Sequence, residues 1–213
     1  MDDTKHCAGS WITGVSGRPI FFEEKDFYRN VYDIREIAHA LSCTCRFNGH
    51  VVRPYSVAQH CVLCADNVAS ADVVHPDDVL LLRQAALLHD AAEAFIGDIV
   101  RPLKRMLPLF MEIEHRFERE IHKAFGLPEV LPEWVVQRVK EIDNIVLATE
   151  RRDLLPVKSQ EHNWGVLETF PPLKSVIYAL DQRNAADLFL HRARDLNLLH
   201  GDPDEFVKHL RYP

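Results

Sequence analysis

Imidazole and carboxylate side chains stand at four places where the surrounding residues are apolar: His60, the adjacent pair His89 and Asp90, and Asp143. Together these groups suit a divalent ion such as Mn²⁺, Fe²⁺, Co²⁺, Ni²⁺ or Zn²⁺. A charged carboxylate within an apolar helix is costly unless it is paired or coordinated. Asp90, which lies between Leu88-His89 and Ala91-Ala92, therefore needs a counter-charge, and a metal ion would supply it.

Two more carboxylates follow the His-Asp pair. Glu93 comes four residues after His89, on the same face of one continuous helix, and Asp98 follows Gly97 at the expected helix end. A ligand set of this kind leaves coordination positions open for water and substrate. A metal lowers the pKa of such a water, and Glu93 or Asp98 could orient it or move its proton.

Basic residues gather directly after this acidic segment, at Arg101, Lys104 and Arg105. They could neutralise an anionic substrate that bridges to the metal, or they could be a solvated helix start; the functional interpretation is favoured for Lys104. The formal net charge of −7 argues against a general nucleic-acid-binding protein, which would show a basic excess. The expected partner is therefore a small anionic molecule and not a nucleic acid.

The order of these residues resembles the signature of the HD-domain phosphohydrolases, His … His-Asp … Asp. The longer matching segments are Ser56-Val57-Ala58-Gln59-His60, Leu88-His89-Asp90-Ala91-Ala92-Glu93, Gly97-Asp98 and Pro102-Leu103-Lys104. The resemblance covers about residues 33–155. It implies that His60, His89, Asp90 and Asp143 bind one divalent ion (Co²⁺, Mn²⁺, Zn²⁺ or Fe²⁺, or Mg²⁺ with a triphosphate), and that Glu93 and Asp98 are the catalytic carboxylates.

Within that superfamily the chain is similar to the bacterial 5′-deoxynucleotidases and the phage dATP triphosphohydrolases. In that branch an arginine and an aromatic residue precede the first metal-binding histidine, and here Arg46-Phe47 stands before His60. The resemblance implies that Arg46 and Lys104 contact phosphate and that Phe47 lies against the sugar or base. Many members carry Trp where this chain has Phe47, and this difference bears on base selectivity.

The expected activity is removal of phosphate or triphosphate from nucleotides, with purine deoxynucleotides such as dATP or dAMP as substrates. One alternative is a cyclic-nucleotide phosphodiesterase, which usually has extra metal-binding histidines before the last aspartate. His115 and His122 fall in that interval, although on an expected Glu-rich helical surface. The other alternative is a catalytically silent nucleotide-binding module, which would have no need for unpaired carboxylates in an apolar helix.

The sequence pattern predicts that residues 1–213 form a single all-α domain, a helical bundle of the HD-domain type. A short N-terminal hairpin is expected from the apolar segments that end near Phe22. Capping and stop signals predict two helices that begin after Asp33 and Ser56, and two more over about 76–95 and 108–125. Further helices are predicted from 132 through Ala148, from 172 with a possible interruption near Asp181, and from 203. Residues 156–172 are expected to be a loop, in which His162 and Trp164 have no assigned role.

The chain is expected to be cytoplasmic and without a membrane partner, because no apolar run approaches the ~20 residues of a membrane span and the N-terminus does not resemble a secretory signal. The odd number of cysteines, five, in a chain expected to be cytosolic argues against a disulfide framework. The pairs Cys43-Cys45 and Cys61-Cys64 are interpreted as buried small hydrophobes on helices in preference to a zinc site. Homo-oligomers are common in the related branch, and self-association is left open.

Overall fold

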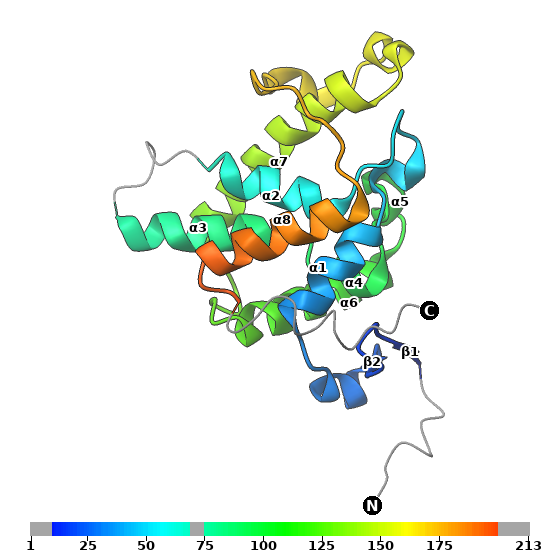
Figure 1. Ribbon diagram of the computed structural model, residues 1–213. Coiled ribbons are helices and arrows are strands. Elements are labelled where there is room, and N and C mark those ends of the chain that lie inside the picture. Colours follow the sequence, from blue (N-terminus) through cyan, green and yellow to red (C-terminus); the bar gives the residue numbers. More distant parts are fainter. Residues whose placement is uncertain (1–9, 69–74, 200–213) are drawn as a thin grey trace, which may run out of the picture.

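The computed structural model describes residues 10–68 and 75–199, and it confirms the expected all-α fold with an N-terminal hairpin (Figure 1). Strands β1 (Trp11–Thr13) and β2 (Pro19–Phe21) pair antiparallel, with Trp11 opposite Phe21. The α-helices are α1 (Ile34–Cys43), α2 (Val57–Asp66), α3 (Pro76–Leu88), α4 (Glu93–Ile96), α5 (Arg101–Lys104), α6 (Pro108–Ala124), α7 (Glu133–Leu154) and α8 (Gln182–Asp195). Short 3-10 turns cover Glu24–Arg29, Arg46–Gly49, Val157–Glu161 and Gly165–Thr169.

The predicted N-caps at the first two helices are present. Asp33 Oδ1 accepts a hydrogen bond from the Arg35 backbone N–H at 2.9 Å, and Ser56 Oγ accepts one from the Gln59 N–H at 3.2 Å. Each cap satisfies a donor that the first helical turn would otherwise leave unpaired. The cap at Ser56 fixes where α2 begins, and so places His60 in the second turn of that helix.

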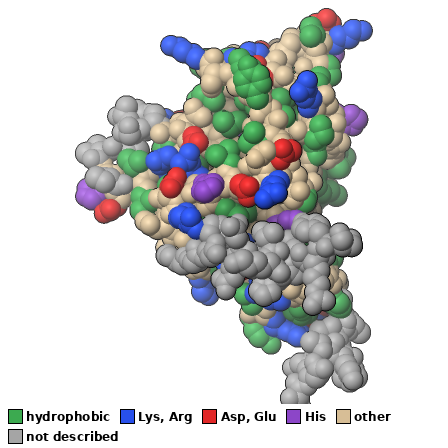
Figure 2. All heavy atoms as spheres, viewed as in Figure 1, with side chains coloured by type: hydrophobic (Ala, Val, Ile, Leu, Met, Phe, Trp, Pro, Cys, Tyr) green, Lys and Arg blue, Asp and Glu red, His purple; other side chains and the backbone are tan. Residues whose placement is uncertain are grey.

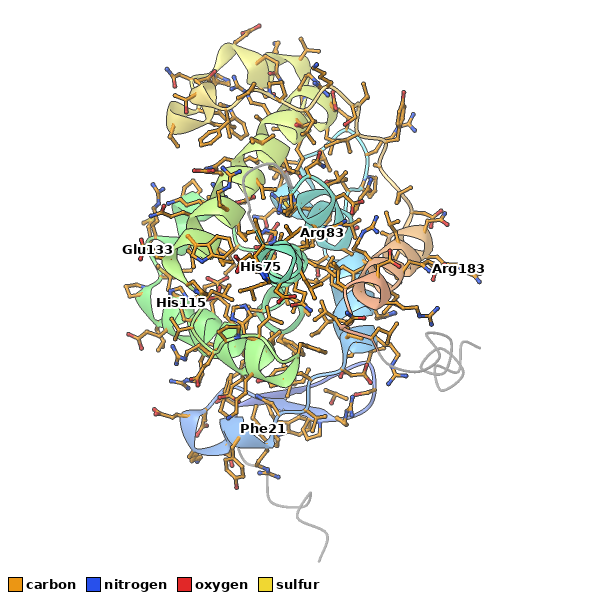
Figure 3. All side chains as sticks on the ribbon, turned by 90° about the vertical axis from the view of Figure 1, so that its left-hand side faces the viewer. Phe21, His75, Arg83, His115, Glu133 and Arg183 are labelled. Atoms are coloured by element: carbon orange, nitrogen blue, oxygen red, sulfur yellow. The ribbon has the colours of Figure 1, made fainter. Side chains whose placement is uncertain are left out.

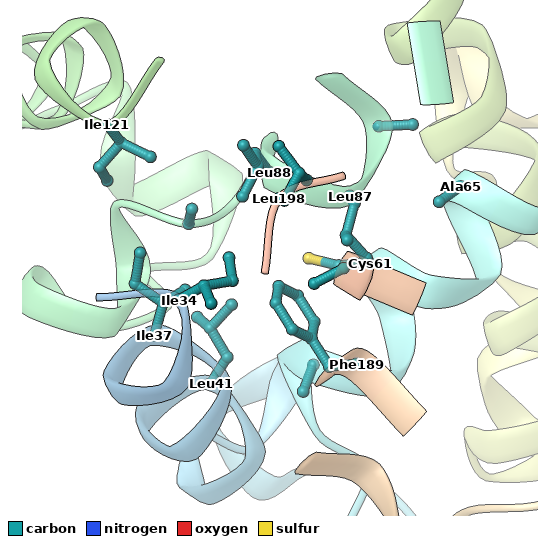
Figure 4. Packing of buried hydrophobic residues seen from close by; sticks show 14 of the residues in the cluster. Ile34, Ile37, Leu41, Cys61, Ala65, Leu87, Leu88, Ile121, Phe189 and Leu198 are labelled. Carbon is teal, nitrogen blue, oxygen red and sulfur yellow. The ribbon is translucent and has the colours of Figure 1, made fainter. Parts of the chain in front are cut away.

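The core surrounds α2, which packs against α1, α3, α7 and α8. Figure 4 shows this packing, in which side chains such as Leu41, Cys61, Leu87 and Phe189 meet from four separate helices. Cys61 and Cys64 are fully buried, as expected for small hydrophobes on a helix. Cys43 is exposed, and the expectation of burial on a helix is wrong for that pair.

The outward side of α8 is polar, in contrast to its buried side. Arg192 donates to Asp66 Oδ2 at 2.9 Å and to Asp195 Oδ2 at 2.8 Å. Figure 2 shows basic and acidic side chains next to one another on the face that Figure 1 presents. This alternation of charge is typical of a solvated helix face.

The central helix predicted over residues 76–95 is interrupted. α3 ends at Leu88, and tight turns follow, in which the Ala91 N–H donates to Leu88 O at 2.9 Å and the Glu93 N–H donates to Asp90 O at 3.0 Å. His89 itself keeps right-handed helical backbone angles (φ −61°, ψ −33°), and its Nε2 lies 3.2 Å from Asp90 Oδ2. Alanine, a strong helix former, gives no signal of this break.

The prediction of a helix from residue 172 is also wrong. Helix α8 begins only at Gln182, where Asp181 caps it by accepting from the Asn184 N–H at 2.9 Å. The preceding segment runs without helix and is bound to α2, because the Gln59 side chain pairs with Tyr178 O and the Leu180 N–H. Helix α7 continues to Leu154, directly before the loop predicted from about residue 156. The helix expected from residue 203 lies outside the described residues.

Among the helices of the described ranges, none combines the length and the apolarity that a bilayer crossing needs.

Aromatic packing under α6 gives a test of the core. Phe117 is fully buried, and its ring centroid lies 4.6 Å from that of Phe27 and 5.2 Å from that of Phe95. Phe117→Ala is expected to lower the free energy of unfolding by about 3–5 kcal/mol in urea denaturation. Leu109→Ala on the same helix is the control, because Leu109 is 68% exposed and its loss should cost less than about 0.5 kcal/mol. Equal effects of the two changes would contradict this description of the core.

Candidate metal centre and adjoining cavities

The structure brings His60, His89, Asp90 and Asp143 to one place from three parts of the chain. His60 Nε2 lies 3.2 Å from His89 Nε2 and 3.3 Å from Asp143 Oδ1. Asp90 Oδ2 lies 3.2 Å from His89 Nε2 and 3.6 Å from His60 Nε2. Nitrogen and oxygen ligands at 2.0–2.2 Å from a common ion would be about 3–3.5 Å apart. The spacing and the donor types therefore fit one divalent ion.

Both aspartates of this cluster are held in the ionised form that a ligand needs. Burial opposes ionisation of Asp143, but the hydrogen bond and charge of His60 lower the pKa of Asp143 to about 2. Burial likewise opposes ionisation of Asp90, and the neighbouring His89 brings the pKa of Asp90 far below its ordinary value. Carboxylates that remain charged against burial are suited to a cation.

Each histidine is oriented by a partner on its other ring nitrogen. His60 Nδ1 lies 2.7 Å from Glu150 Oε1, and His89 Nδ1 lies 2.9 Å from Ala86 O. A carboxylate or carbonyl that accepts from Nδ1 fixes the tautomer in which Nε2 is the ligand. Both Nε2 atoms are the ones that face the cluster.

Glu150 contacts the cluster directly, and the sequence analysis missed it. It lies on α7 seven residues after Asp143, which places both on one face two turns apart, and it is fully buried. The signal was present in the sequence, since a glutamate within an apolar helix face calls for a partner as much as Asp90 does.

Two arginines pair with carboxylates of the cluster: Arg46 with Asp90 and Glu150, and Arg101 with Asp143. Arg46 Nη1 lies 3.4 Å from Asp90 Oδ2, and its Nη2 lies 3.2 Å from Glu150 Oε2. Arg101 pairs with Asp143 and also donates to Asn144 Oδ1 at 3.0 Å. The sequence analysis gave Arg101 less weight than Lys104, although Arg101 reaches the cluster directly.

The Arg46 side chain is presented by an unusual turn. Phe47 and Asn48 have φ values of 56° and 50°, in the left-handed region that non-glycine residues seldom adopt. The turn is tied to the start of α2 by the Arg46 N–H, which donates to Tyr55 O at 2.9 Å. Backbone in this conformation persists where surrounding contacts hold it and is often found at functional sites.

A cavity of about 400 Å³ adjoins the cluster. Its walls contain several residues singled out from the sequence, namely Arg46, Phe47, Asp90, Glu93, Asp98, Lys104 and Asp143. Arg101 and Arg105 also line the cavity, as do Trp164, Val166 and Leu167 of the segment that follows α7, here called the Trp164 segment. The expected catalytic and substrate-binding side chains thus share one cavity with two of the expected ligands.

Glu93 is the buried acid of this cavity. Only 5% of Glu93 is exposed, and its Oε2 has no hydrogen-bond partner among the described residues. Burial, followed by the charges of Asp90 and Asp98, raises the pKa of Glu93 well above its ordinary value. Burial also raises the pKa of Asp98. A carboxyl group with a raised pKa is suited to proton transfer.

Lys104 lies between two glutamates. Its Nζ donates to Glu114 Oε1 at 2.6 Å and is 3.8 Å from Glu93 Oε1. Glu114 on α6 was not anticipated, because its Glu-rich helix was expected to be surface. The Glu114 contact holds the Lys104 ammonium at the cavity wall, beside the carboxylate expected to act on the substrate.

Another cavity of about 400 Å³ reaches the cluster from the side of α6. It is lined by His89 and Asp143 and by His115, Glu118 and His122. The expected exposure holds for His115, which is labelled in Figure 3 near the start of α7 at Glu133. It is wrong for His122, which is 8% exposed and whose Nδ1 lacks a partner within the described part of the chain.

Cys64 also approaches the cluster. Its Sγ lies 3.6 Å from His60 Nε2, and Cys64, His60 and His89 place potential ligand atoms within 4.8 Å of one another. Cys61, His89 and Asp90 form an overlapping set of the same kind. Burial agrees with the interpretation of both cysteines as core residues, but their proximity to the histidines was not expected.

The Glu150 contact gives a prediction for metal affinity. Glu150→Gln removes the charge that orients His60, and we expect about 10–100-fold weaker Co²⁺ or Zn²⁺ binding in competition with a chromogenic chelator. Glu133→Gln, at the exposed start of the same helix, should bind as the unchanged protein does. Unaltered affinity in Glu150→Gln would show that this contact does not support the ligand.

Comparison with known proteins places the chain in a family. The HD domain family model matches residues 52–175, a range that contains His60, His89, Asp90 and Asp143. The match begins after Arg46-Phe47 and extends past α7 through the Trp164 segment.

Two bacterial proteins are similar to the chain. The uncharacterized protein YfdR of Escherichia coli (strain K12) is 37% identical over 191 residues, which are 89% of this chain and 97% of YfdR. An uncharacterized protein of Rhodobacter capsulatus is 34% identical over 125 residues, which are 57% of this chain and 62% of that protein. From the family match and the similarity to YfdR, the chain belongs to the HD-domain family, the superfamily of metal-dependent phosphohydrolases.

Proposed function

We propose that the protein hydrolyses phosphate esters of nucleotides, and that its substrates are deoxynucleotides, with purines such as dAMP or dATP preferred. The observation that carries this proposal is the cavity where Asp90 and Asp143 meet Glu93, Asp98 and Lys104. Its volume of about 400 Å³ lies within the range of small-molecule sites. The proposal is supported by this combination of acids that could transfer protons and cations that could bind phosphate, beside the four expected metal ligands.

A divalent ion bound by His60, His89, Asp90 and Asp143 would supply Lewis acidity and a water of lowered pKa. Arg46 and Lys104 would bind phosphate oxygens and offset charge that builds up in the transition state. Glu93, whose pKa burial raises well above its ordinary value, would act as the general acid and donate a proton to the departing oxygen. Asp98 would orient the attacking water and accept its proton.

The cations of the cavity bear on the length of the phosphate group. Arg101 and Arg105 line it in addition to Arg46 and Lys104. A monophosphate needs a single phosphate pocket, whereas a triphosphate needs further positive charge. These extra arginines support tolerance of longer phosphate groups. Transition metals such as Co²⁺, Mn²⁺, Zn²⁺ or Fe²⁺ suit the ligand set, and Mg²⁺ would accompany a triphosphate.

The alternative functions have weaker support. A catalytically silent binding module would gain nothing from the buried Glu93 oxygen, which no described residue pairs. A cyclic-nucleotide phosphodiesterase would use His115 or His122 as additional ligands. His115 Nδ1 instead lies 2.9 Å from Glu118 Oε2, and His122 Nδ1 has no hydrogen-bond partner among the described residues, so neither ring is seen in contact with the cluster.

Two substitutions separate metal binding from turnover. Asp90→Ala is expected to abolish both metal retention and hydrolysis, because it removes a ligand. Glu93→Ala should retain the metal and lower kcat by about 10²–10⁴-fold, because it removes a proton-transfer group. Asp187→Ala, an exposed position on α8, is the control.

The assay incubates each variant with Co²⁺, Mn²⁺, Zn²⁺ or Mg²⁺ and a panel of ribo- and deoxynucleoside mono- and triphosphates. Ion-exchange chromatography then separates nucleoside, orthophosphate and triphosphate. Release of a deoxynucleoside supports the proposal, and the accompanying anion distinguishes monophosphatase from triphosphohydrolase. Full activity of Asp90→Ala, or no turnover of any nucleotide by the unchanged protein, would overturn it.

A further inference from the structure

The segment after α7 forms part of the cavity that holds the expected catalytic carboxylates. It contains the 3-10 turns Val157–Glu161 and Gly165–Thr169, with Trp164 directly before the second. Trp164, Val166 and Leu167 line the cavity together with Phe47 and Lys104. This segment, which sequence reasoning left without a role, is therefore in a position to meet the substrate.

Arg151 of α7 holds the segment in place. It is 9% exposed, and its Nη1 donates to Glu168 Oε1 at 2.6 Å. Its Nη2 donates to His162 O at 2.8 Å and to Gln160 O at 3.2 Å. One buried guanidinium therefore binds three points of the segment, and a wall held this way is ordered before a ligand arrives.

The same arginine positions the Trp164 ring. The guanidinium carbon of Arg151 lies 5.2 Å from the ring centroid, a cation–π contact. The Trp164 backbone N–H donates to Glu168 Oε1 at 3.0 Å, so Glu168 connects the arginine and the tryptophan backbone. Trp164 is half-buried, with part of its surface in the cavity. The ring is thus held by its neighbours, and part of it lines the cavity.

The cavity lining combines charged residues, among them Asp143, Lys104 and Arg46, with apolar ones, among them Leu147, Trp164 and Leu167. Leu147 lies one helical turn beyond Asp143 on α7, so on this helix the wall changes from charged to apolar with distance from the cluster, and we take the apolar part to include Trp164. A phosphate ester with its anionic group at the metal would direct its organic group toward this apolar part. An aromatic wall there favours a flat, aromatic organic group.

We propose that Trp164 is the stacking surface for the base of the substrate, which makes it a specificity-determining residue and the ligand a nucleotide with an aromatic heterocycle. This inference rests on the proposed function, because it assumes that the phosphate lies at the metal centre. Stacking is tolerant of base identity, and the larger purines gain more contact than the pyrimidines.

Kinetics with and without a base test this role. Trp164→Leu is expected to lower kcat/KM for dAMP by roughly tenfold or more, whereas deoxyribose 5-phosphate, which lacks the base, should be hydrolysed as before. Trp164→Phe, which keeps an aromatic ring, should recover most of the loss. An equal loss on both substrates would mean that Trp164 only supports the wall, and would overturn the proposal.

Tryptophan fluorescence gives a readout that does not require turnover. Titration with deoxyadenosine should quench the unchanged protein and a Trp134→Phe control, and should leave Trp164→Phe unquenched. Quenching that survives in Trp164→Phe and disappears in Trp134→Phe would place the base near the start of α7 and contradict the proposal. Quenching assigned to Trp164 in a protein that hydrolyses no phosphate ester would instead overturn the proposed phosphohydrolase and leave base binding at Trp164 in place.

Discussion

The buried contact between His60 and Glu150 is the constraint on which the rest of the site depends. It joins α2 to α7 at 2.7 Å, and both side chains are wholly inaccessible to solvent. Buried charge of this kind is tolerated only when it is fully paired, and here Arg46 supplies the second partner of Glu150. Because Asp143 is two turns away on the same helix, the pairing also sets where that ligand meets His60. Fold and chemistry are therefore coupled through one face of α7.

The site residues that could be predicted from the sequence were polar residues that stand in otherwise apolar helical segments. His60, Asp90 and Asp143 are polar within apolar patterns, and it is their occurrence together with His89, in one order along the chain, that marks them. The helix starts after Asp33 and Ser56 could also be predicted, because an N-cap is a local interaction between residues close in sequence. Glu150 carried the same kind of signal as Asp90 and was overlooked.

Other features depend on contacts between distant segments and have no local signature. The break after Leu88 lies next to Ala91 and Ala92, which are good helix formers, and no residue of this segment signals it. The extended segment before α8 is held by Gln59, more than a hundred residues earlier in the chain. The position of Trp164 follows from Arg151, and neither residue alone indicates that they meet.

The central claim is that His60, His89, Asp90 and Asp143 hold one divalent ion. X-ray absorption spectroscopy of Co²⁺-loaded protein, together with metal analysis, tests it most directly. The predicted result is one ion per chain, surrounded only by nitrogen and oxygen ligands with two imidazoles resolved in the outer-shell scattering. A sulfur ligand would bring Cys61 or Cys64 into the site and contradict the four-residue ligand set, and failure to retain any ion would contradict the metal centre itself.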